Sequence, residues 1–170
     1  LAAMVETADA YFRAHAIARA SSRLIGMSLG GEDFAMDIGC LPDTDTLLVP
    51  KQTVMIAAKA AGLMAMGFIG TVADYNDTEG FRAAIRKSVK FGFDCASVIH
   101  PSGIPILNEE FTPTKESFDH ARRVIEAYEA ARLAGKGAIT VDGKMIDVPI
   151  VIRAERLLAR YEAIRARAGN

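Results

Sequence analysis

Four short apolar segments alternate with segments of helical pattern along this chain, and the alternation constrains the fold more than any other feature. The apolar segments cover residues 1–5, 24–29, 64–69 and 96–99. Helices are expected near residues 9–21, 51–61, 78–91 and 115–133. Continuous apolar strands between helices are typical of a parallel sheet covered on both faces. Four such units make half of an eightfold barrel or a small open sheet, and the pattern alone favours neither.

The C-terminal segment has a different pattern. Strand-like runs at residues 138–141 and 144–146 flank Asp142-Gly143, a dipeptide typical of a two-residue hairpin turn. Pro149 then suits the first turn of a helix. We therefore predict a division into residues 1–134, with the strand–helix units, and residues 135–170, with a hairpin and a helix.

Composition excludes several functional classes. The 170 residues include 20 basic and 21 acidic side chains, so there is no electrostatic footprint for nucleic acid. No apolar run approaches the ~20 residues of a membrane span, and no signal peptide is indicated. Cys40 and Cys95 are far apart, and we expect reduced thiols in a cytoplasmic protein. Because Leu1 lies directly in an apolar run, we expect the C-terminal part of a longer polypeptide.

Two carboxylates follow the first two apolar segments. Glu6 follows the first segment and Asp33 the second, and parallel strands bring their carboxyl ends to one edge of a sheet. Two hard oxygen donors suit Mg²⁺, and Gly30-Gly31 lets backbone approach a ligand closely. Acids at strand ends also cap helices, and spacing alone does not separate the two interpretations. Glu32 is expected to point the opposite way if Asp33 faces the edge, so we expect it to form a salt bridge or to support the site from behind its ligands.

Two other polar residues also have a structural and a functional interpretation. His100 follows the fourth apolar segment and precedes Pro101, where it either satisfies a local hydrogen bond or contacts a substrate. Asp147 can favour the start of the last helix, and its position alone does not make it catalytic. Phosphate-loop, dinucleotide and nucleophile-elbow motifs are absent from the sequence, and the three histidines have no zinc-site spacing.

A series of short motifs resembles the citrate lyase β-subunit-like branch of the HpcH/HpaI aldolase family. Each motif is weak by itself, but the series follows the order of the family. The motifs are VETA (5–8), GEDF (31–34) with DIG (37–39), AAKAAGL (57–63), NDTEGF (76–81), VIHP (98–101), NEEFTP (108–113) and GKMIDVP (143–149).

The resemblance implies a (β/α)8 TIM-type barrel, of which this chain covers roughly strands five to eight and a C-terminal hairpin-and-helix lid. The implied activity is Mg²⁺-dependent cleavage or formation of a carbon–carbon bond in a β-hydroxyacyl-CoA thioester such as malyl-, citramalyl- or citryl-CoA. It also implies a homo-oligomer, a trimer or a multiple, with lids exchanged between subunits. The alternatives are a malyl-CoA thioesterase-like hydrolase and a catalytically inactive fragment or assembly subunit.

The resemblance also assigns roles to residues. Glu6 and Asp33 become the Mg²⁺ ligands, at the ends of strands five and six. His100-Pro101 closes strand eight, near the CoA portion of the substrate, and Asp147 matches a lid aspartate that acts as acid/base at the thioester α-carbon. The family's other half-barrel, with its phosphate contacts and an arginine near the metal, lies outside this sequence. Val49-Pro50-Lys51 departs from the family pattern, and we expect this to alter the loop near the substrate.

Overall fold

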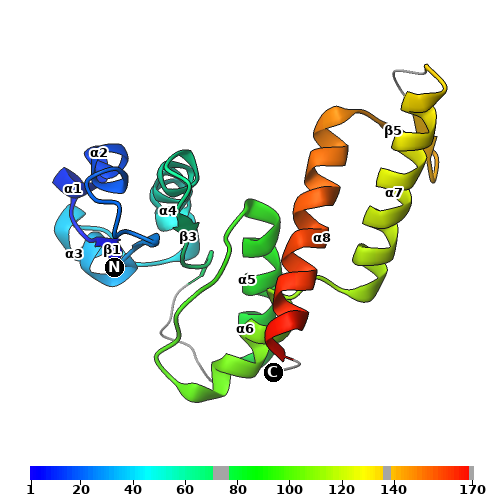
Figure 1. Ribbon diagram of the computed structural model, residues 1–170. Coiled ribbons are helices and arrows are strands. Elements are labelled where there is room, and N and C mark those ends of the chain that lie inside the picture. Colours follow the sequence, from blue (N-terminus) through cyan, green and yellow to red (C-terminus); the bar gives the residue numbers. More distant parts are fainter. Residues whose placement is uncertain (71–76, 136–138, 169–170) are drawn as a thin grey trace. The chain divides into compact units, whose positions relative to one another are not determined.

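The computed structural model describes residues 1–70, 77–135 and 139–168. The chain forms two compact units, Leu1–Phe111 and Thr112–Asn170, which run from blue to green and from yellow-green to red in Figure 1. We predicted a different boundary, after residue 134, between the half-barrel and the C-terminal lid. That boundary refers to the complete barrel and stays a prediction. Among the described residues, no helix combines the length and the apolar character that a membrane crossing requires.

The first unit contains a three-stranded parallel sheet. Its strands are β1 (Ala2–Val5), β2 (Gly26–Leu29) and β3 (Met64–Ala65), in the order β1-β2-β3. Val5 pairs with Leu29, and Met27 pairs with Ala65. The parallel sheet predicted from the first three apolar segments is therefore confirmed.

The fourth apolar segment, residues 96–99, forms no strand among the described residues. Pairing stops just before it, at an isolated parallel bridge between Met66 and Cys95. The Asp94 N–H donates to the Ala65 carbonyl, and the Gly67 N–H donates to the Cys95 carbonyl. Gly67 has a φ of +126°, a conformation that glycine tolerates and that ends the extended run of β3.

Several helices of the first unit differ from the prediction. The helix expected over residues 9–21 is split at Arg13, whose φ of −101° and ψ of 6° interrupt the helix. The helix expected to begin at residue 51 begins at Thr44, because the Asp43 side chain accepts hydrogen bonds from the next turn. The helices are α1 (Ala8–Phe12), α2 (Ala14–Ala18), α3 (Gly31–Ile38), α4 (Thr44–Ala60), α5 (Thr78–Phe91) and α6 (Ile104–Glu110), with a 3-10 turn at Pro101–Gly103.

The core of the first unit lies between the sheet and its helices. Val5 of β1, Met27 of β2 and Ala65 of β3 are fully buried, and Ala58 of α4 and Ile85 of α5 are buried in the same cluster. Burying each large apolar side chain contributes about 1.5–3 kcal/mol. This packing fixes the carboxyl end of the sheet, where the candidate site lies.

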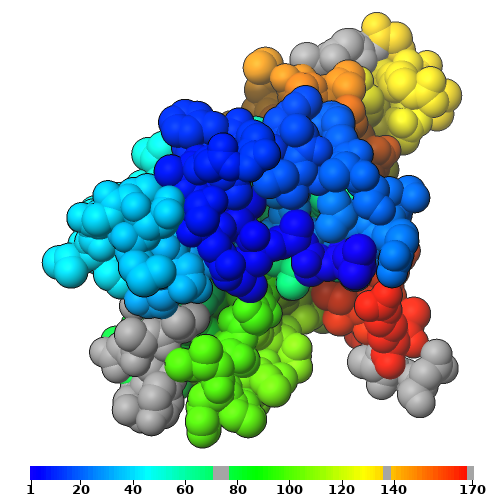
Figure 2. Space-filling view, turned by 90° about the vertical axis from the view of Figure 1, so that its left-hand side faces the viewer, coloured from blue at the N-terminus to red at the C-terminus, as the bar shows by residue number. Residues whose placement is uncertain are grey.

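β1 is an edge strand of this sheet, with β2 as its neighbour. The side chains of Leu1 and Met4 are 62% and 57% exposed. In Figure 2 the N-terminal residues, in the darkest blue, lie open at the surface of the first unit. The first unit therefore leaves apolar side chains at and just before β1 uncovered.

The second unit consists of α7 (Lys115–Leu133), a hairpin of β4 (Ile139–Val141) and β5 (Lys144–Ile146), and α8 (Val148–Ala168). Asp142 and Gly143 have φ values of +49° and +76°, as a two-residue turn of type I′ requires. Val124 of α7 and Val151 of α8 are buried in one cluster with Ile146. The predicted hairpin and final helix are thus confirmed, while residue 138 lies outside the described residues.

Candidate metal and substrate site

Glu6 and Asp33 lie at the same edge of the parallel sheet. Glu6 follows Val5, the last residue of β1, and Asp33 lies in the first turn of α3, just after β2. Val5 pairs with Leu29, and the Gly30 N–H donates to the Val5 carbonyl at 2.9 Å. Because Val5 and Leu29 are paired, β1 and β2 end at the same level of the sheet, and the segments that hold Glu6 and Asp33 leave it side by side.

Gly30 allows the Glu6 side chain to lie directly against the backbone that leads into α3. A Cβ atom at Gly30 would lie 2.6 Å from Glu6 Cγ and 2.9 Å from Glu6 Oε1. Distances this short are steric clashes. The backbone of Gly30, with φ −79° and ψ 94°, is open to any residue. A side chain at this position would displace Glu6, so glycine acts here through space and not through backbone conformation.

α3 is held from both sides, and this fixes the direction of its first turn. Phe34 and Ala35 are buried in a small cluster with Leu47 of α4. At the other end of the helix, Asp37 Oδ2 accepts a 2.7 Å hydrogen bond from the N–H of Ala8, the first residue of α1. α3 is therefore tied to the segment that directly follows Glu6.

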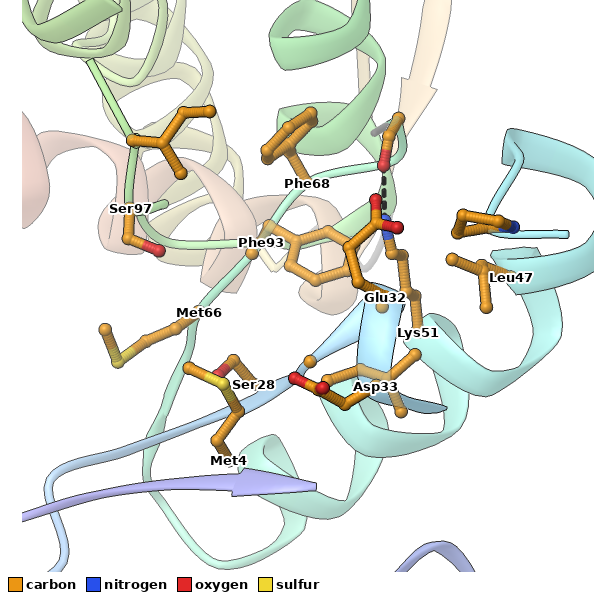
Figure 3. Close-up of a pocket in the computed structure, with 17 residues that line it drawn as sticks. Met4, Ser28, Glu32, Asp33, Leu47, Lys51, Met66, Phe68, Phe93 and Ser97 are labelled. Atoms are coloured by element: carbon orange, nitrogen blue, oxygen red, sulfur yellow. Dashed lines mark hydrogen bonds between the residues drawn. The ribbon is translucent and has the colours of Figure 1, made fainter. Parts of the chain in front are cut away.

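A cavity of about 330 Å³ lies beside Asp33. Figure 3 shows the Asp33 carboxylate on the side of the cavity where Met4 and Ser28 lie. Glu6 is not one of the described residues that line the cavity, since its carboxylate lies against Gly30. The structure thus brings the two predicted ligands to one edge of the sheet but places only Asp33 at the cavity wall.

Glu32 also lines the cavity, but its carboxylate lies apart from that of Asp33 and interacts electrostatically with Lys51. This agrees with the expected salt-bridge role. Residues Gly31–Ile38 are a helix, in which successive side chains are about 100° apart, so the two neighbouring acids reach different parts of the wall. In Figure 3 the Glu32 carboxylate lies near the Lys51 ammonium.

Lys51 of α4 is a member of the cavity wall that the sequence analysis did not select as a site residue. Its Nζ donates a hydrogen bond to the Gly70 carbonyl and lies 5.4 Å from the centroid of the Phe68 ring. Burial lowers the pKa of Lys51 to about 8, although the nearby Glu32 carboxylate acts in the opposite direction. In the sequence, the one indication that Lys51 lies near the site was its place in Val49-Pro50-Lys51, the segment that departs from the family pattern.

His100 and Pro101 begin a short 3-10 turn. His100 Nδ1 lies 2.8 Å from Ser102 Oγ and accepts a hydrogen bond from the Ser102 N–H at 3.3 Å. Pro101 is the first residue of the turn, where a missing N–H costs nothing. The nearby Ser97 and Ile99 line the cavity. The structural interpretation of His100 is thus confirmed, and contact of His100 and Pro101 with CoA stays a prediction.

Asp147 lies directly before α8 in the second unit. Its Oδ1 accepts a 3.4 Å hydrogen bond from the Ile150 N–H, and its carbonyl accepts one from the Val151 N–H. Asp147 therefore helps to start the helix, as its position before Val148-Pro149 suggested. Its role as an acid/base stays a prediction.

The donor set fits Mg²⁺ better than a metal that needs a full protein cage. No group of three or more His, Cys, Asp or Glu side chains that could hold a metal ion occurs within residues 1–70, 77–135 and 139–168. Mg²⁺ commonly takes one or two carboxylates and completes its shell with waters and substrate oxygens. Glu6 and Asp33, two carboxylates at one edge of the sheet, meet that requirement.

A parallel sheet with acidic residues beside a cavity at its carboxyl edge is the arrangement of α/β enzymes. The sequence model of the HpcH/HpaI aldolase/citrate lyase family matches residues 1–101. The chain therefore belongs to this family of (β/α)8-barrel lyases.

Two curated relatives and one solved structure show how much of the family's length is present. The chain is 38% identical to citrate lyase subunit beta of Escherichia coli (strain K12), over 95% of this chain and 54% of that protein. It is 36% identical to (3S)-malyl-CoA thioesterase of Cereibacter sphaeroides (strain ATCC 17029 / ATH 2.4.9), over 96% of this chain and 57% of that protein. The chain thus spans about half the length of these curated relatives.

The solved structure is that of the protein CitE from Mycobacterium tuberculosis, in complex with magnesium, acetoacetate and coenzyme A. It matches with a TM-score of 0.79 and 31% identity, over 94% of this chain and 60% of that chain. The similarity extends over nearly all of this chain.

Proposed function

We propose that the full-length protein is a Mg²⁺-dependent carbon–carbon lyase that acts on a β-hydroxyacyl-CoA thioester such as malyl-, citramalyl- or citryl-CoA. The observation that carries this proposal is the pair Glu6 and Asp33 at one edge of the sheet, with Asp33 on the cavity wall. A lyase among the relatives and magnesium with coenzyme A in a structural neighbour support it. We place the protein in the cytoplasm.

Glu6 and Asp33 would hold the metal ion. When bound, Mg²⁺ would act as a Lewis acid that stabilises negative charge on the β-oxygen of the substrate. Gly30 contributes by leaving the space that the Glu6 side chain occupies. The Asp37 bond to Ala8 contributes by fixing α3 against the segment that follows Glu6.

Asp147 would transfer the proton at the α-carbon. In the cleavage direction the β-hydroxyl loses its proton to water, the bond between the α- and β-carbons breaks as the β-oxygen becomes a carbonyl, and the α-carbon of the resulting thioester enolate receives a proton. Asp147 would deliver this proton, and in condensation it would remove it. Within a homo-oligomer, a trimer or a multiple, Asp147 would come from the lid of a neighbouring subunit. His100 and Pro101 would contact the CoA portion.

The test uses the full-length protein with malyl-CoA or citramalyl-CoA and Mg²⁺. We expect acetyl-CoA and a keto acid as products. Glu6→Gln and Asp33→Asn should each abolish Mg²⁺-dependent cleavage, because an amide is a much poorer Mg²⁺ ligand than a carboxylate. Asp45→Asn is the matched control, since Asp45 is exposed in the first turn of α4. Unchanged Mg²⁺ dependence in both variants would show that the ligands are wrong.

Hydrolysis is a second candidate function, because one of the relatives is a malyl-CoA thioesterase. The same assay separates the two reactions. Free CoA with malate indicates hydrolysis, whereas acetyl-CoA with glyoxylate indicates carbon–carbon cleavage. No product from a broad panel of CoA esters, with a folded protein, would support an inactive assembly subunit instead.

A further inference from the structure

We propose that Lys51 binds a carboxylate on the acyl group of the substrate, and thereby selects CoA thioesters whose acyl group carries a second acidic function. This inference rests on the proposed function and deepens it. By this inference, the residue that determines which acyl group binds is Lys51 of α4, which is not one of the proposed metal ligands.

The Lys51 side chain reaches the cavity by passing along the first residue of α3. A Cβ atom at Gly31 would lie 3.7 Å from Lys51 Cε and 3.9 Å from Lys51 Nζ. The ammonium therefore lies beside the same helical turn that carries Asp33. Figure 3 shows Lys51 and Asp33 as separate members of the cavity wall.

The ammonium is held in place before any ligand binds. The Gly70 carbonyl accepts one of its three possible hydrogen bonds, and the buried Phe68 ring lies 5.4 Å away. A positioned cation costs less entropy on binding than a mobile surface lysine. Burial also lowers the pKa of Lys51 to about 8 despite the neighbouring Glu32 carboxylate. A ligand carboxylate would offset the desolvation that this shift reflects.

The other parts of the wall suit a short acyl chain. Met66, Phe68 and Phe93 contribute apolar surface, while Gly30 and Gly31 contribute backbone. A cavity of about 330 Å³ is at the small end of ligand sites and suits an acyl group better than a whole CoA molecule. Glu32 and Asp33 also line the wall, with the Glu32 carboxylate near the Lys51 ammonium, and Lys51 is the one cation among the described lining residues. The carboxylate of a short acyl chain would therefore have to share this ammonium with Glu32.

The experiment compares succinyl-CoA with butyryl-CoA as calorimetric ligands of the full-length protein. The two thioesters differ by a carboxylate in place of a methyl group, and neither has the β-hydroxyl that cleavage requires. We expect the wild-type protein to bind succinyl-CoA more tightly. Lys51→Met should lower this preference by about tenfold or more and leave butyryl-CoA binding nearly unchanged, because one partner of a desolvated charge pair is lost. Lys51→Arg should retain most of the preference.

Lys87→Met is the matched control, because the Lys87 ammonium also lies near an aromatic ring, 5.9 Å from the Phe91 centroid, but is exposed. Each titration is repeated in EDTA, so that binding of the carboxylate by Mg²⁺ is removed. A wild-type preference that disappears in EDTA, or that persists unchanged in Lys51→Met, would overturn the role of Lys51 and leave the proposed function standing. Lys51→Gln replaces Lys51→Met if the latter does not fold. Failure of both thioesters to bind the wild-type protein would overturn both proposals.

Discussion

Gly30 leaves the space in which the side chain of Glu6, one of the two candidate ligands, lies. The Glu6 side chain fills the space that a side chain at residue 30 would need, and Met4 Sδ also lies only 3.1 Å from that space. The backbone angles at Gly30 are ordinary, so a substitution acts through this contact and not through strain. A methyl group at this position must displace Glu6 or move the start of α3.

Gly30→Ala should therefore weaken Mg²⁺ binding by roughly tenfold, the lower end of the effect seen when a metal ligand loses its positioning. Isothermal titration of the full-length protein with Mg²⁺ measures the change. Gly39→Ala is the control, because Gly39 ends α3 with a φ of +74° and nothing lies within 4 Å of its Cβ position. That variant should lose about 1 kcal/mol of stability and keep its Mg²⁺ affinity. Wild-type affinity in Gly30→Ala would contradict the prediction.

The sequence could place Asp33 near the site, whereas it could not identify Lys51. Asp33 follows a strand, and the edge at which a parallel strand ends is a local property of the chain. Lys51 belongs to the cavity only because α4 packs beside α3 and its side chain passes Gly31, which is a property of tertiary packing. The different directions of Asp33 and Glu32 were predictable from their adjacent positions, but the partner of Glu32, Lys51, was not.

α5 and α6 are joined by a cluster of charged side chains. Arg82 Nη1 lies 2.5 Å from Glu110 Oε1 and 2.8 Å from Glu109 Oε2, and Arg86 Nε lies 2.8 Å from Glu110 Oε2. The Glu110 side chain is only 10% exposed. Burial acts to raise the pKa of Glu110, but hydrogen bonds from Arg86 and Arg82 outweigh it and leave the pKa below its ordinary value. Glu110 therefore connects the last two helices of the first unit.

Glu110→Gln should lower the melting temperature at neutral pH by a few degrees, because both arginines lose a charged partner. The difference from wild type should shrink as the pH falls below the ordinary carboxyl value of 4.5. A carboxyl with a lowered pKa in the folded state stabilises the fold above its unfolded-state pKa and loses this contribution on protonation. Thermal melts between neutral pH and pH 3, with exposed Glu155→Gln as control, measure this. A difference that is constant with pH would contradict the linkage.

The elements with clear end signals were the most predictable ones. α5 ends before Gly92, which has a φ of +105°, and α7 begins after Thr114, whose hydroxyl accepts a hydrogen bond from the Ser117 N–H. Both helices have the predicted bounds. α3 and α6 could not be predicted, because each is short and its apolar side chains pack against distant elements, as Phe34 does against Leu47.

At the scale of the whole molecule, the chain corresponds to only part of the length of its relatives. The chain spans about half of the curated relatives, and β1 has β2 as its neighbour in the sheet. Every strand of a closed barrel has two neighbours. In the complete barrel, the exposed edge of β1 is therefore where we expect the remaining strands to pair. This arrangement would cover Leu1 and Met4 and complete the site around Glu6 and Asp33.

Exchange of lids between subunits can be tested by mixing inactive variants. If Asp147 enters the site of a neighbour, Asp33→Asn and Asp147→Asn damage different subunits' contributions to one site. Full-length variants that are each inactive should then recover a fraction of wild-type activity when co-expressed, because some mixed sites contain Asp33 from one subunit and Asp147 from another. Cleavage of malyl-CoA by mixed oligomers, purified through two different affinity tags, measures this recovery.

Asp33→Asn co-expressed with Glu6→Gln is the matched control. By our proposal both residues belong to the same barrel end and hold the same ion, so every mixed site lacks one of them and no activity should return. Recovery confined to the pair with Asp147→Asn therefore requires the site to draw residues from two chains. If doubly tagged oligomers form and the Asp33→Asn and Asp147→Asn pair stays inactive, Asp147 does not complete a neighbour's site, and the lid must act within its own subunit or have no catalytic part.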